Sequence, residues 1–184
     1  MANVFIVHGT GGSPERNWFP WLKQELEKLG CRAFVPKFPT PENQSLKSWL
    51  DVFERYRKNL DENAIVVGHN IGSAFLLSVL EKAKPVKAAF FVAGFTGLLG
   101  NKTYDNLNKT FVDKVFEWKI IRKNCGRFCL INSDNDPYVP LDKGKDLAKR
   151  LGAEFIVLEK AGHINQESGY TQFELLFNKI KQEL

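Results

Sequence analysis

Short apolar runs alternate with longer amphipathic stretches along most of the chain. The runs are rich in Val, Ile and Phe, and they are continuous, with no regular polar position between the apolar ones. Continuous runs of this kind are typical of parallel strands that are covered on both faces. The predicted strands are residues 4–7, 32–35, 64–67, 88–92, 128–132 and 155–158.

Helices are predicted between these strands, because apolar residues recur there at helical spacing with charged residues on the other face. The predicted helices are residues 18–29, 45–60, 71–83, 141–151 and 170–184. The helix at 71–83 is almost wholly apolar up to Glu81, so we expect it to be the most buried one. Gly152 directly follows the helix at 141–151 and is a good C-cap residue.

This alternation of strands and helices predicts an α/β fold with a parallel sheet and right-handed crossovers. We expect a three-layer α/β/α arrangement in which six mostly parallel strands have the order 2-1-3-4-5-6. The length of 184 residues fits a single domain over residues 1–184. Residues 97–124 interrupt the rhythm, because they are polar and rich in Asn and Lys. We expect this segment to be a short cap-like insertion of one or two helices over the top of the sheet.

Charge and hydrophobicity argue against two classes of partner. The net charge is +5 and the pI is near 9.1, but acidic and basic residues are interspersed along the predicted helices. A nucleic-acid-binding face needs clustered basic residues, so we predict no nucleic-acid partner. No apolar run approaches the roughly 18 residues of a membrane helix, and the first residues lack the features of a signal peptide. We therefore expect no membrane partner and a cytoplasmic location.

Cofactor and metal motifs are missing as well. The chain has three cysteines, and an odd number argues against a disulfide framework. Cys125 and Cys129 are close in sequence, but zinc needs four ligands and no neighbouring His or Cys completes a set. The glycines in residues 9–12 belong to neither a G-x-G-x-x-G pattern nor a Walker motif. We predict no cofactor, no metal site, and cysteines that serve as small buried residues.

Loops rich in polar residues, three of them with glycines, follow four of the six predicted strands. They are residues 8–13, 68–72, 133–140 and 161–165. In open α/β sheets, ligands bind where loops leave the carboxyl ends of the strands. These four loops together form the candidate site.

The loop at 68–72 has the form G-x-N-x-G between a predicted strand and a predicted helix. With serine in place of Asn70, this would be the nucleophile elbow, a tight turn that lifts one side chain above the sheet. The glycines allow strand and helix to pass closely, and Asn tolerates strained φ values better than most residues. The pattern therefore places Asn70 at the nucleophile position.

The order of the other loops supports this interpretation. Hydrolases with such an elbow run nucleophile, acid and histidine along the chain, and here Asn70 precedes Asp136, which precedes His163. Asp136 would hold His163 in the required tautomer, and His163 would act as general base and acid. Asp134 is a rival for the acid. The backbone N–H groups of Ile71 and Thr10 would form the oxyanion hole.

Further residues are candidates for substrate binding: His8, Gly9, His69, Phe95 and Trp118. We expect His8 to shape the oxyanion loop through a hydrogen bond. His69 lies beside the apex, where a histidine is more often structural and packs under the turn. The aromatic residues Tyr104, Phe111, Phe116 and Trp118 either line an acyl pocket or pin the 97–124 segment to the core, and the sequence favours neither option.

Longer segments carry a resemblance to a known family. They include Val7-His8-Gly9, Asn17-Trp18-Phe19-Pro20-Trp21-Leu22-Lys23, Trp49-Leu50, Val67-Gly68-His69, residues 134–140 and Gly162-His163. Over essentially its whole length, the chain resembles the YdeN-like, or retinoblastoma-binding-protein-nine-like, small serine hydrolases. The resemblance implies an α/β-hydrolase fold, a Ser-His-Asp triad, and hydrolysis of a small-molecule ester, amide or peptide-like substrate. It also favours Asp136 over Asp134, from its spacing to Val139 and Pro140. The Leu-x-Cys-x-Glu motif is absent, so a retinoblastoma-type partner does not carry over.

Asn70 departs from the serine of that family. The lone pair of a carboxamide nitrogen is delocalised, so histidine cannot turn it into a nucleophile near neutral pH. Our leading hypothesis is a hydrolase whose activity is weak or lost, in which His163 activates water directly. The alternative is a pseudoenzyme, a non-catalytic ligand-binding or protein-interaction module. An asparagine engineered into an ordinary serine hydrolase is a third option, and deamidation to an aspartate nucleophile is disfavoured by the bulky Ile71.

Overall fold

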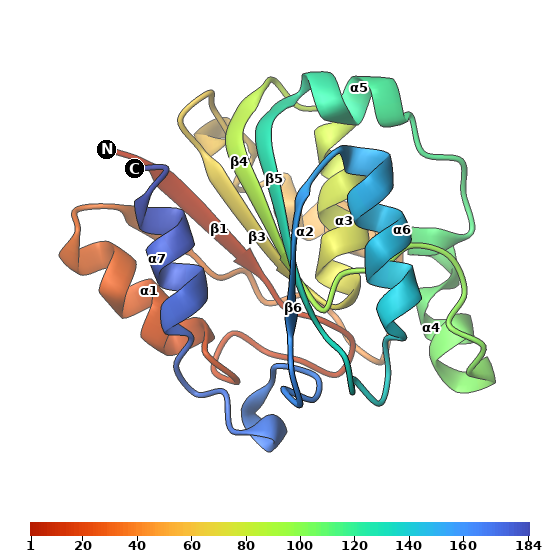
Figure 1. The fold of residues 1–184 in the computed structure, drawn as a ribbon. Helices are drawn as coiled ribbons and strands as arrows, with labels where there is room; N and C mark the ends of the chain where they lie inside the picture. Colours follow the sequence, from red (N-terminus) through yellow and green to blue (C-terminus); the bar gives the residue numbers. More distant parts are fainter.

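Six strands form one sheet in the computed structural model, which describes all of residues 1–184 (Figure 1). The strands are β1 (Asn3–Val7), β2 (Arg32–Phe34), β3 (Ile65–His69), β4 (Val86–Val92), β5 (Cys125–Ser133) and β6 (Glu154–Leu158). Their order is β2-β1-β3-β4-β5-β6, and every neighbouring pair is parallel. The predicted strand order is therefore confirmed.

Helices cover both faces of this sheet and make the three predicted layers (Figure 1). One face carries α1 (Phe19–Lys28) and α7 (Glu174–Lys181). The other face carries α2 (Leu46–Phe53), α3 (Ile71–Leu80), α4 (Lys102–Val112), α5 (Trp118–Lys123) and α6 (Leu141–Leu151). None of these helices combines the length and hydrophobicity that a membrane crossing requires.

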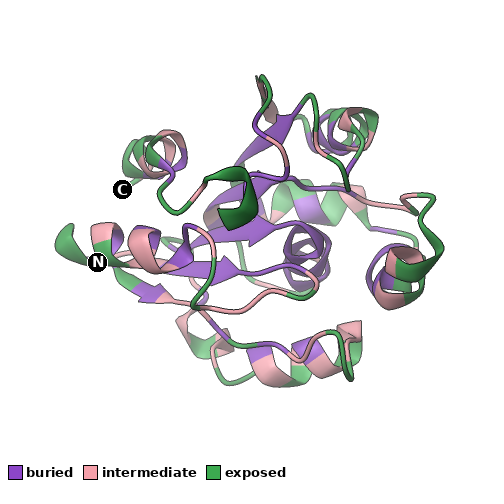
Figure 2. Cartoon of the chain, turned by 90° about the horizontal axis from the view of Figure 1, so that it is seen from below, coloured by how far each residue is buried: buried purple, intermediate pink, exposed green.

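The core lies in two layers, one on each face of the sheet, because successive strand side chains point to opposite faces. On β1, Phe5 and Val7 face one layer, whereas Val4 and Ile6 face the other. Figure 2 views the chain from the side where the strands end and shows buried strands between helices with exposed outer surfaces. Each large apolar side chain buried this way contributes about 1.5–3 kcal/mol.

The most buried helix is α3, as predicted from its composition, since every residue from Ile71 to Leu80 is buried. Its two serines satisfy their hydroxyls locally: Ser73 donates to the Gly68 carbonyl and Ser78 to the Ala74 carbonyl. The helix ends three residues before the predicted residue 83, because Glu81 and Lys82 close a turn before the chain enters β4.

Two other predicted helices are shorter than expected. In place of a helix at 45–60, the chain forms α2 and then a separate 3₁₀ turn at Arg57–Asn59, with Ser45 and Ser48 forming a capping box at the start of α2. In place of a helix at 170–184, α7 begins at Glu174. Tyr170 instead donates its N–H to the Asn165 carbonyl, so residues before α7 complete the loop that carries His163.

The segment 97–124 forms two helices, α4 and α5, within the crossover from β4 to β5. Only α4 lies level with the carboxyl ends of the strands, whereas α5 lies near their opposite ends, next to the start of β5 (Figure 1). Asn124 ties the end of α5 to the Leu80 carbonyl at the end of α3. The expectation that this whole segment lies over one end of the sheet is therefore wrong for α5.

Candidate active site

Asn70 lies at the apex of the turn between β3 and α3, with φ 56° and ψ −125°. The two flanking glycines are required by close approach. A Cβ on Gly68 would lie 2.8 Å from the Gly72 and Ser73 backbone, and a Cβ on Gly72 would lie 2.6 Å from the Val7 carbonyl oxygen. The turn therefore has the tight, strained geometry of a nucleophile elbow.

The loop after β1 passes directly over Asn70. A Cβ on Gly9 would lie 2.6 Å from the Asn70 Cβ and 3.0 Å from its Oδ1, so no larger residue fits there. His8 holds this loop, because its Nδ1 bonds to the Gly9 carbonyl and its Nε2 accepts from the Phe38 N–H. The expected hydrogen bond from His8 is present, and the ring is fully buried.

His163 lies between Asn70 and Asp136. Its Nδ1 is 2.8 Å from Asp136 Oδ2, and the Asp136 side chain is fully buried. The other carboxylate oxygen accepts the N–H groups of Tyr138 and Val139, at 2.8 and 3.0 Å. Asp134 binds elsewhere, since its Oδ1 accepts the Lys160 N–H. The structure thus brings Asp136 to His163, and not its rival.

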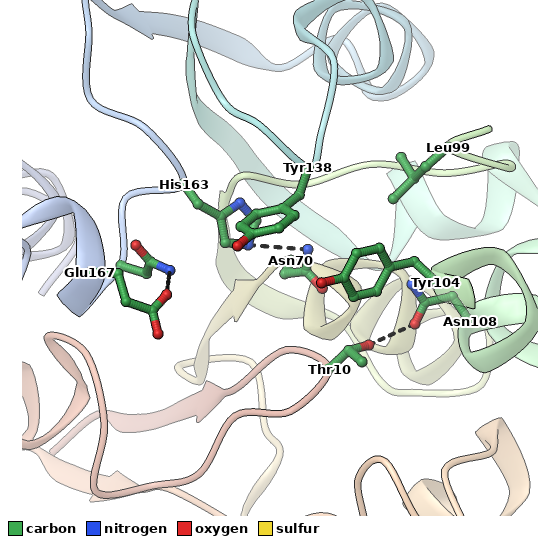
Figure 3. A pocket seen from close by; sticks show the side chains of 9 residues that line it. Thr10, Asn70, Leu99, Tyr104, Asn108, Tyr138, His163 and Glu167 are labelled. Atoms are coloured by element: carbon green, nitrogen blue, oxygen red, sulfur yellow. Dashed lines mark hydrogen bonds between the residues drawn. The ribbon is translucent and has the colours of Figure 1, made fainter. Parts of the chain in front are cut away.

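The Asn70 side chain points at the other ring nitrogen of His163, with Nδ2 at 3.3 Å from Nε2 (Figure 3). An amide nitrogen can only donate, so Nε2 is the acceptor and the proton of the neutral ring lies on Nδ1, facing Asp136. This is the tautomer that a serine-type triad uses. Asn70 therefore makes the same hydrogen bond that a serine hydroxyl would make, but with a group that cannot be deprotonated.

Both backbone polar groups of His163, its N–H and its carbonyl, make hydrogen bonds to side chains. Its N–H donates to Ser168 Oγ at 3.1 Å, and its carbonyl accepts from His69 Nε2 at 3.0 Å. The next carbonyl, that of Ile164, accepts from Trp18 Nε1. On the other side of His163, the Gly162 N–H donates to Asn135 Oδ1. These bonds restrain the backbone of residues 162–164 from four separate parts of the chain. They therefore keep the His163 ring close to Asn70.

Two backbone N–H groups belong to residues close to Asn70, in the chain or at the cavity beside it. Ile71 is the first residue of α3, where helical N–H groups have no intrahelical partner and the helix dipole favours negative charge. The Thr10 N–H makes no hydrogen bond within the chain, and Thr10 lines the same cavity as Asn70. They are the two groups that the sequence predicts for an oxyanion hole.

Burial sets the charge of two histidines next to the site. His69 is almost fully buried, and burial, together with the positive potential of His163, lowers its pKa to about 3. Burial also lowers the pKa of His8. Both rings are therefore neutral near pH 7, and His69 uses its Nε2–H as a fixed donor to the His163 loop.

A cavity of about 210 Å³ opens beside Asn70 and His163 (Figure 3). Its walls come from α4, from the loops after β5 and β6, and from the loop after β1; they are Thr10, Asn70, Leu99, Tyr104, Asn108, Tyr138, His163, Asn165 and Glu167. A second hollow of about 100 Å³ lies on the side of Gly9, Arg16 and His69 and shares Asn70 and His163 with the first. Cavities for drug-sized ligands are larger, roughly 300–1,000 Å³, so the group that enters here is small.

Three of the residues considered for substrate binding do not line these cavities. His8 is buried beneath the oxyanion loop and does not reach the cavity surface. Phe95 is fully buried in the core on the α3 side of the sheet. Trp118 lines a different groove with Phe116 and stacks with Arg150, because α5 lies away from the carboxyl ends of the strands. Gly9 and His69 do line the smaller hollow.

Asn108 and Tyr138 line the cavity but are not among the residues predicted from the sequence patterns. Tyr138 packs its ring edge-on against His163 with centroids 5.0 Å apart. Asn108 is only 2% exposed, on a helix whose other polar residues face solvent. The sequence does contain a feature that points to Asn108. It lies on the same helix face as Tyr104, Phe111 and Val112, so it is a polar residue in an otherwise apolar stripe.

No group of three or more His, Cys, Asp or Glu side chains gathers into a possible metal site. All three cysteines are buried as free thiols, as predicted. The side chains that hydrogen-bond to one another at this site are those of His163, Asp136 and Asn70.

Comparisons with known proteins identify the family. The family described as "Serine hydrolase" matches residues 4–182. The chain is 30% identical to YdeN of Bacillus subtilis (strain 168) over 180 residues, covering 96% of this chain and 93% of YdeN. It is 26% identical to the serine hydrolase RBBP9 of Rattus norvegicus over 186 residues, covering 100% of this chain and 96% of the relative.

Solved structures give the same result for the fold. The crystal structure of the ydeN gene product from B. subtilis superposes with a TM-score of 0.93 at 27% identity, covering 100% of this chain and 98% of that one. The esterase domain of a Rhodothermus marinus protein superposes with a TM-score of 0.70 at 18% identity, covering 98% and 87%, and shows the fold alone. The chain belongs to the serine hydrolase family and has an α/β-hydrolase fold of the YdeN and RBBP9 type.

Proposed function

We propose that this chain binds a small ester, amide or peptide-like substrate and hydrolyses it slowly, without an acyl-enzyme intermediate. In this proposal His163 is the general base and acid, Asp136 holds its tautomer, and the N–H groups of Thr10 and Ile71 bind the oxyanion. The observation that carries the proposal is the pair of contacts at His163, with Asp136 at 2.8 Å and Asn70 at 3.3 Å.

Asn70 closes the usual route. An acyl-enzyme forms when the base takes a proton from a serine hydroxyl, whose oxygen then attacks the carbonyl carbon. The amide nitrogen of Asn70 donates to His163 but keeps its proton, because its lone pair is delocalised into the carbonyl. The remaining nucleophile for the same base is water.

The water route uses the other parts of the site unchanged. A water molecule displaces the Asn70 amide from His163 Nε2, loses a proton to that nitrogen and attacks the substrate carbonyl. The negative charge that develops on the carbonyl oxygen is stabilised by the two backbone N–H groups. His163 then gives the proton to the leaving alcohol or amine. Sites that lack one triad member keep roughly 10³- to 10⁴-fold catalysis over water in other hydrolases, so slow turnover is the expected level.

A binding protein without turnover is the second candidate, and one observation favours it. The Asn70 Nδ2–H already occupies the only free lone pair of His163. If that hydrogen bond persists with ligand bound, no water reaches the base, and the cavity serves recognition alone.

Hydrolysis of p-nitrophenyl acetate and butyrate distinguishes the candidates. We expect slow hydrolysis by the chain as given, background rates for His163→Ala, and a gain of at least about 100-fold for Asn70→Ser, since the triad acts as a unit. Equal rates for the parent and His163→Ala, with the gain in Asn70→Ser retained, would support the binding protein. No gain in a folded Asn70→Ser variant would contradict the assignment of the site.

A further inference from the structure

A partly buried hydrogen-bond network joins α4 to the loop after β1. Gln44, from the segment between β2 and α2, donates from Nε2 to the Leu107 carbonyl at 3.2 Å and to Asn108 Oδ1 at 2.9 Å. Thr10 Oγ1 donates to the same Asn108 oxygen at 2.7 Å. Thr40 Oγ1 bonds to Gln44 Oε1 at 2.5 Å and accepts the Gly11 N–H at 2.7 Å.

This network determines which way the Asn108 amide points. A backbone carbonyl only accepts, so the Gln44 atom at Leu107 is the NH₂ group. That NH₂ group also faces Asn108, which must therefore present its oxygen. The Asn108 oxygen is thus turned toward Thr10 and Gln44, and its nitrogen lies on the other side of the amide (Figure 3).

The Asn108 nitrogen makes no hydrogen bond, although the residue is only 2% exposed. It is not among the sealed polar atoms, and Asn108 lines the cavity beside Asn70, so its two N–H donors open onto that cavity. Asn is a poor residue for a helix interior, and a buried donor without an acceptor is costly. Holding Thr10 in place would need only an acceptor, so the free NH₂ group is left without a role inside the chain.

The charges around the cavity restrict what that donor can bind. None of the residues that line it is Lys or Arg, whereas Glu167 is one of them. In this cavity a carboxylate or phosphate would meet no Lys or Arg and one repelling carboxylate, since Arg16 lines only the smaller hollow. Tyr104 and Tyr138, whose rings are in edge contact with centroids 5.7 Å apart, provide an apolar wall. The donor therefore fits a neutral oxygen on a group that also packs against the two tyrosine rings.

We infer that Asn108 is a substrate-recognition residue, whose NH₂ group binds a neutral oxygen acceptor of the substrate group that enters the cavity. The acceptor is an ether, hydroxyl or amide-carbonyl oxygen near the scissile bond. This inference rests on the proposed function for its substrate class, since it names a feature of the ester or amide bound at Asn70 and His163. It predicts a preference for polar over purely aliphatic substrates of the same shape.

Matched esters test the preference in the Asn70→Ser background. One pair varies the acyl group (p-nitrophenyl methoxyacetate and butyrate), and the other varies the alcohol (2-methoxyethyl acetate and butyl acetate). Asn108→Asp keeps the acceptor for Thr10 and Gln44 and replaces only the donor. Asn106→Asp makes the same charge change at an exposed position of α4. Comparing variants cancels the intrinsic reactivity of each ester.

For each pair, the measured quantity is kcat/KM for the methoxy ester divided by kcat/KM for the aliphatic ester. In one of the two pairs we expect Asn108→Asp to lower this ratio by roughly 3- to 10-fold, which corresponds to the loss of one neutral hydrogen bond. Asn106→Asp should leave both ratios unchanged. An unchanged ratio in both pairs with Asn108→Asp would overturn the inference. If no Asn70→Ser preparation hydrolyses any ester, the proposed function is contradicted, and the inference on Asn108 is decided by the binding measurement below.

A binding measurement then tests the inference independently of turnover. In the chain as given, the ¹⁵N–¹H signals of the Asn108 side chain, assigned by their loss in Asn108→Asp, are followed during titration with methoxyacetamide and butyramide. We expect a saturable shift with methoxyacetamide and a much smaller one with butyramide. Equal shifts for the two amides, or none for either, would overturn the inference.

Discussion

His69 Nε2 donates a hydrogen bond to the backbone carbonyl of His163, 3.0 Å away, so the residue before the elbow apex holds the loop that carries the candidate base. The two rings are also in edge contact, with centroids 4.8 Å apart. A carbonyl needs a donor but not a charge, and burial keeps the His69 ring neutral by lowering its pKa to about 3. The folded state therefore depends on an unprotonated His69.

This dependence predicts acid sensitivity. The pKa of His69 is about 3 when folded and about 6.5 when unfolded, so between these values the unfolded chain binds more protons and stability falls as the pH falls. By pH 5, relative to pH 7.5, His69 accounts for a loss of about 2 kcal/mol in the free energy of unfolding. His8, whose pKa is lowered by burial, adds a loss of the same sign.

Urea denaturation of the parent and His69→Gln at both pH values measures this. Glutamine keeps an N–H donor for the His163 carbonyl and removes the titrating group, so the variant should lose less stability than the parent on acidification. The part due to His8 is common to both proteins. The same loss in the parent and the variant would show that His69 does not titrate as described.

The side chains of Asp136 and Asp134 have different hydrogen-bond partners although the residues lie two positions apart. In the Asn70→Ser background, we expect Asp136→Asn to lower kcat for p-nitrophenyl acetate by about 10⁴-fold, because the ring of His163 loses its tautomer partner. Asp134→Asn is the matched control and should change kcat less than threefold, since the Asp134 side chain bonds only to the Lys160 N–H. Comparable losses in the two variants would argue against Asp136 as the triad acid.

The close packing at the elbow predicts a large effect of one methyl group. A Cβ on Gly72 would lie 2.6 Å from the Val7 carbonyl oxygen and 2.7 Å from that of His8, and neither strand nor helix can move freely. We expect Gly72→Ala to lower the free energy of unfolding by about 3 kcal/mol, at the upper end for overpacking. Gly152→Asn is the control, because that position has φ 65° and no atom within 4 Å of a Cβ. Chemical denaturation with equal losses in both variants would contradict this.

The cysteines should behave as core residues. Burial raises the pKa of Cys125 to about 12 and that of Cys129 to about 11, and it also raises the pKa of Cys31. Because the thiolate is the reactive form, we expect no alkylation by iodoacetamide at pH 8 in the native state and three additions after unfolding. Rapid modification in the native state, read by intact mass, would contradict the buried placement.

Several elements could be predicted from local sequence signals because local interactions decide them. The helix at 141–151 has the predicted bounds, since Gly152 adopts the left-handed conformation that ends it. The elbow at Asn70 follows from glycines on both sides. Asp136 and His163 follow from the fixed topology of parallel sheets, which brings the loops after successive strands to one edge.

The parts that the sequence did not reveal depend on long-range packing. The roles of Asn108 and Gln44 arise only when α4 lies against the loop after β1, across 98 residues in the bond between Thr10 and Asn108. Trp118 is an aromatic residue of the kind that lines pockets, but the path of the β4–β5 crossover takes it to a groove away from the cavity beside Asn70. Hydrophobic periodicity gives the face of a helix and not its position along the sheet.

The central claim is that this site is a serine-hydrolase apparatus that lacks only the nucleophilic hydroxyl. Reaction with a fluorophosphonate probe tests it most directly, because the probe needs a serine activated by His163 and an oxyanion hole, and no particular substrate. Intact mass should show one adduct per molecule of Asn70→Ser, and none on the parent or on Asn70→Ser combined with His163→Ala. A folded Asn70→Ser variant that stays unlabelled would contradict the account.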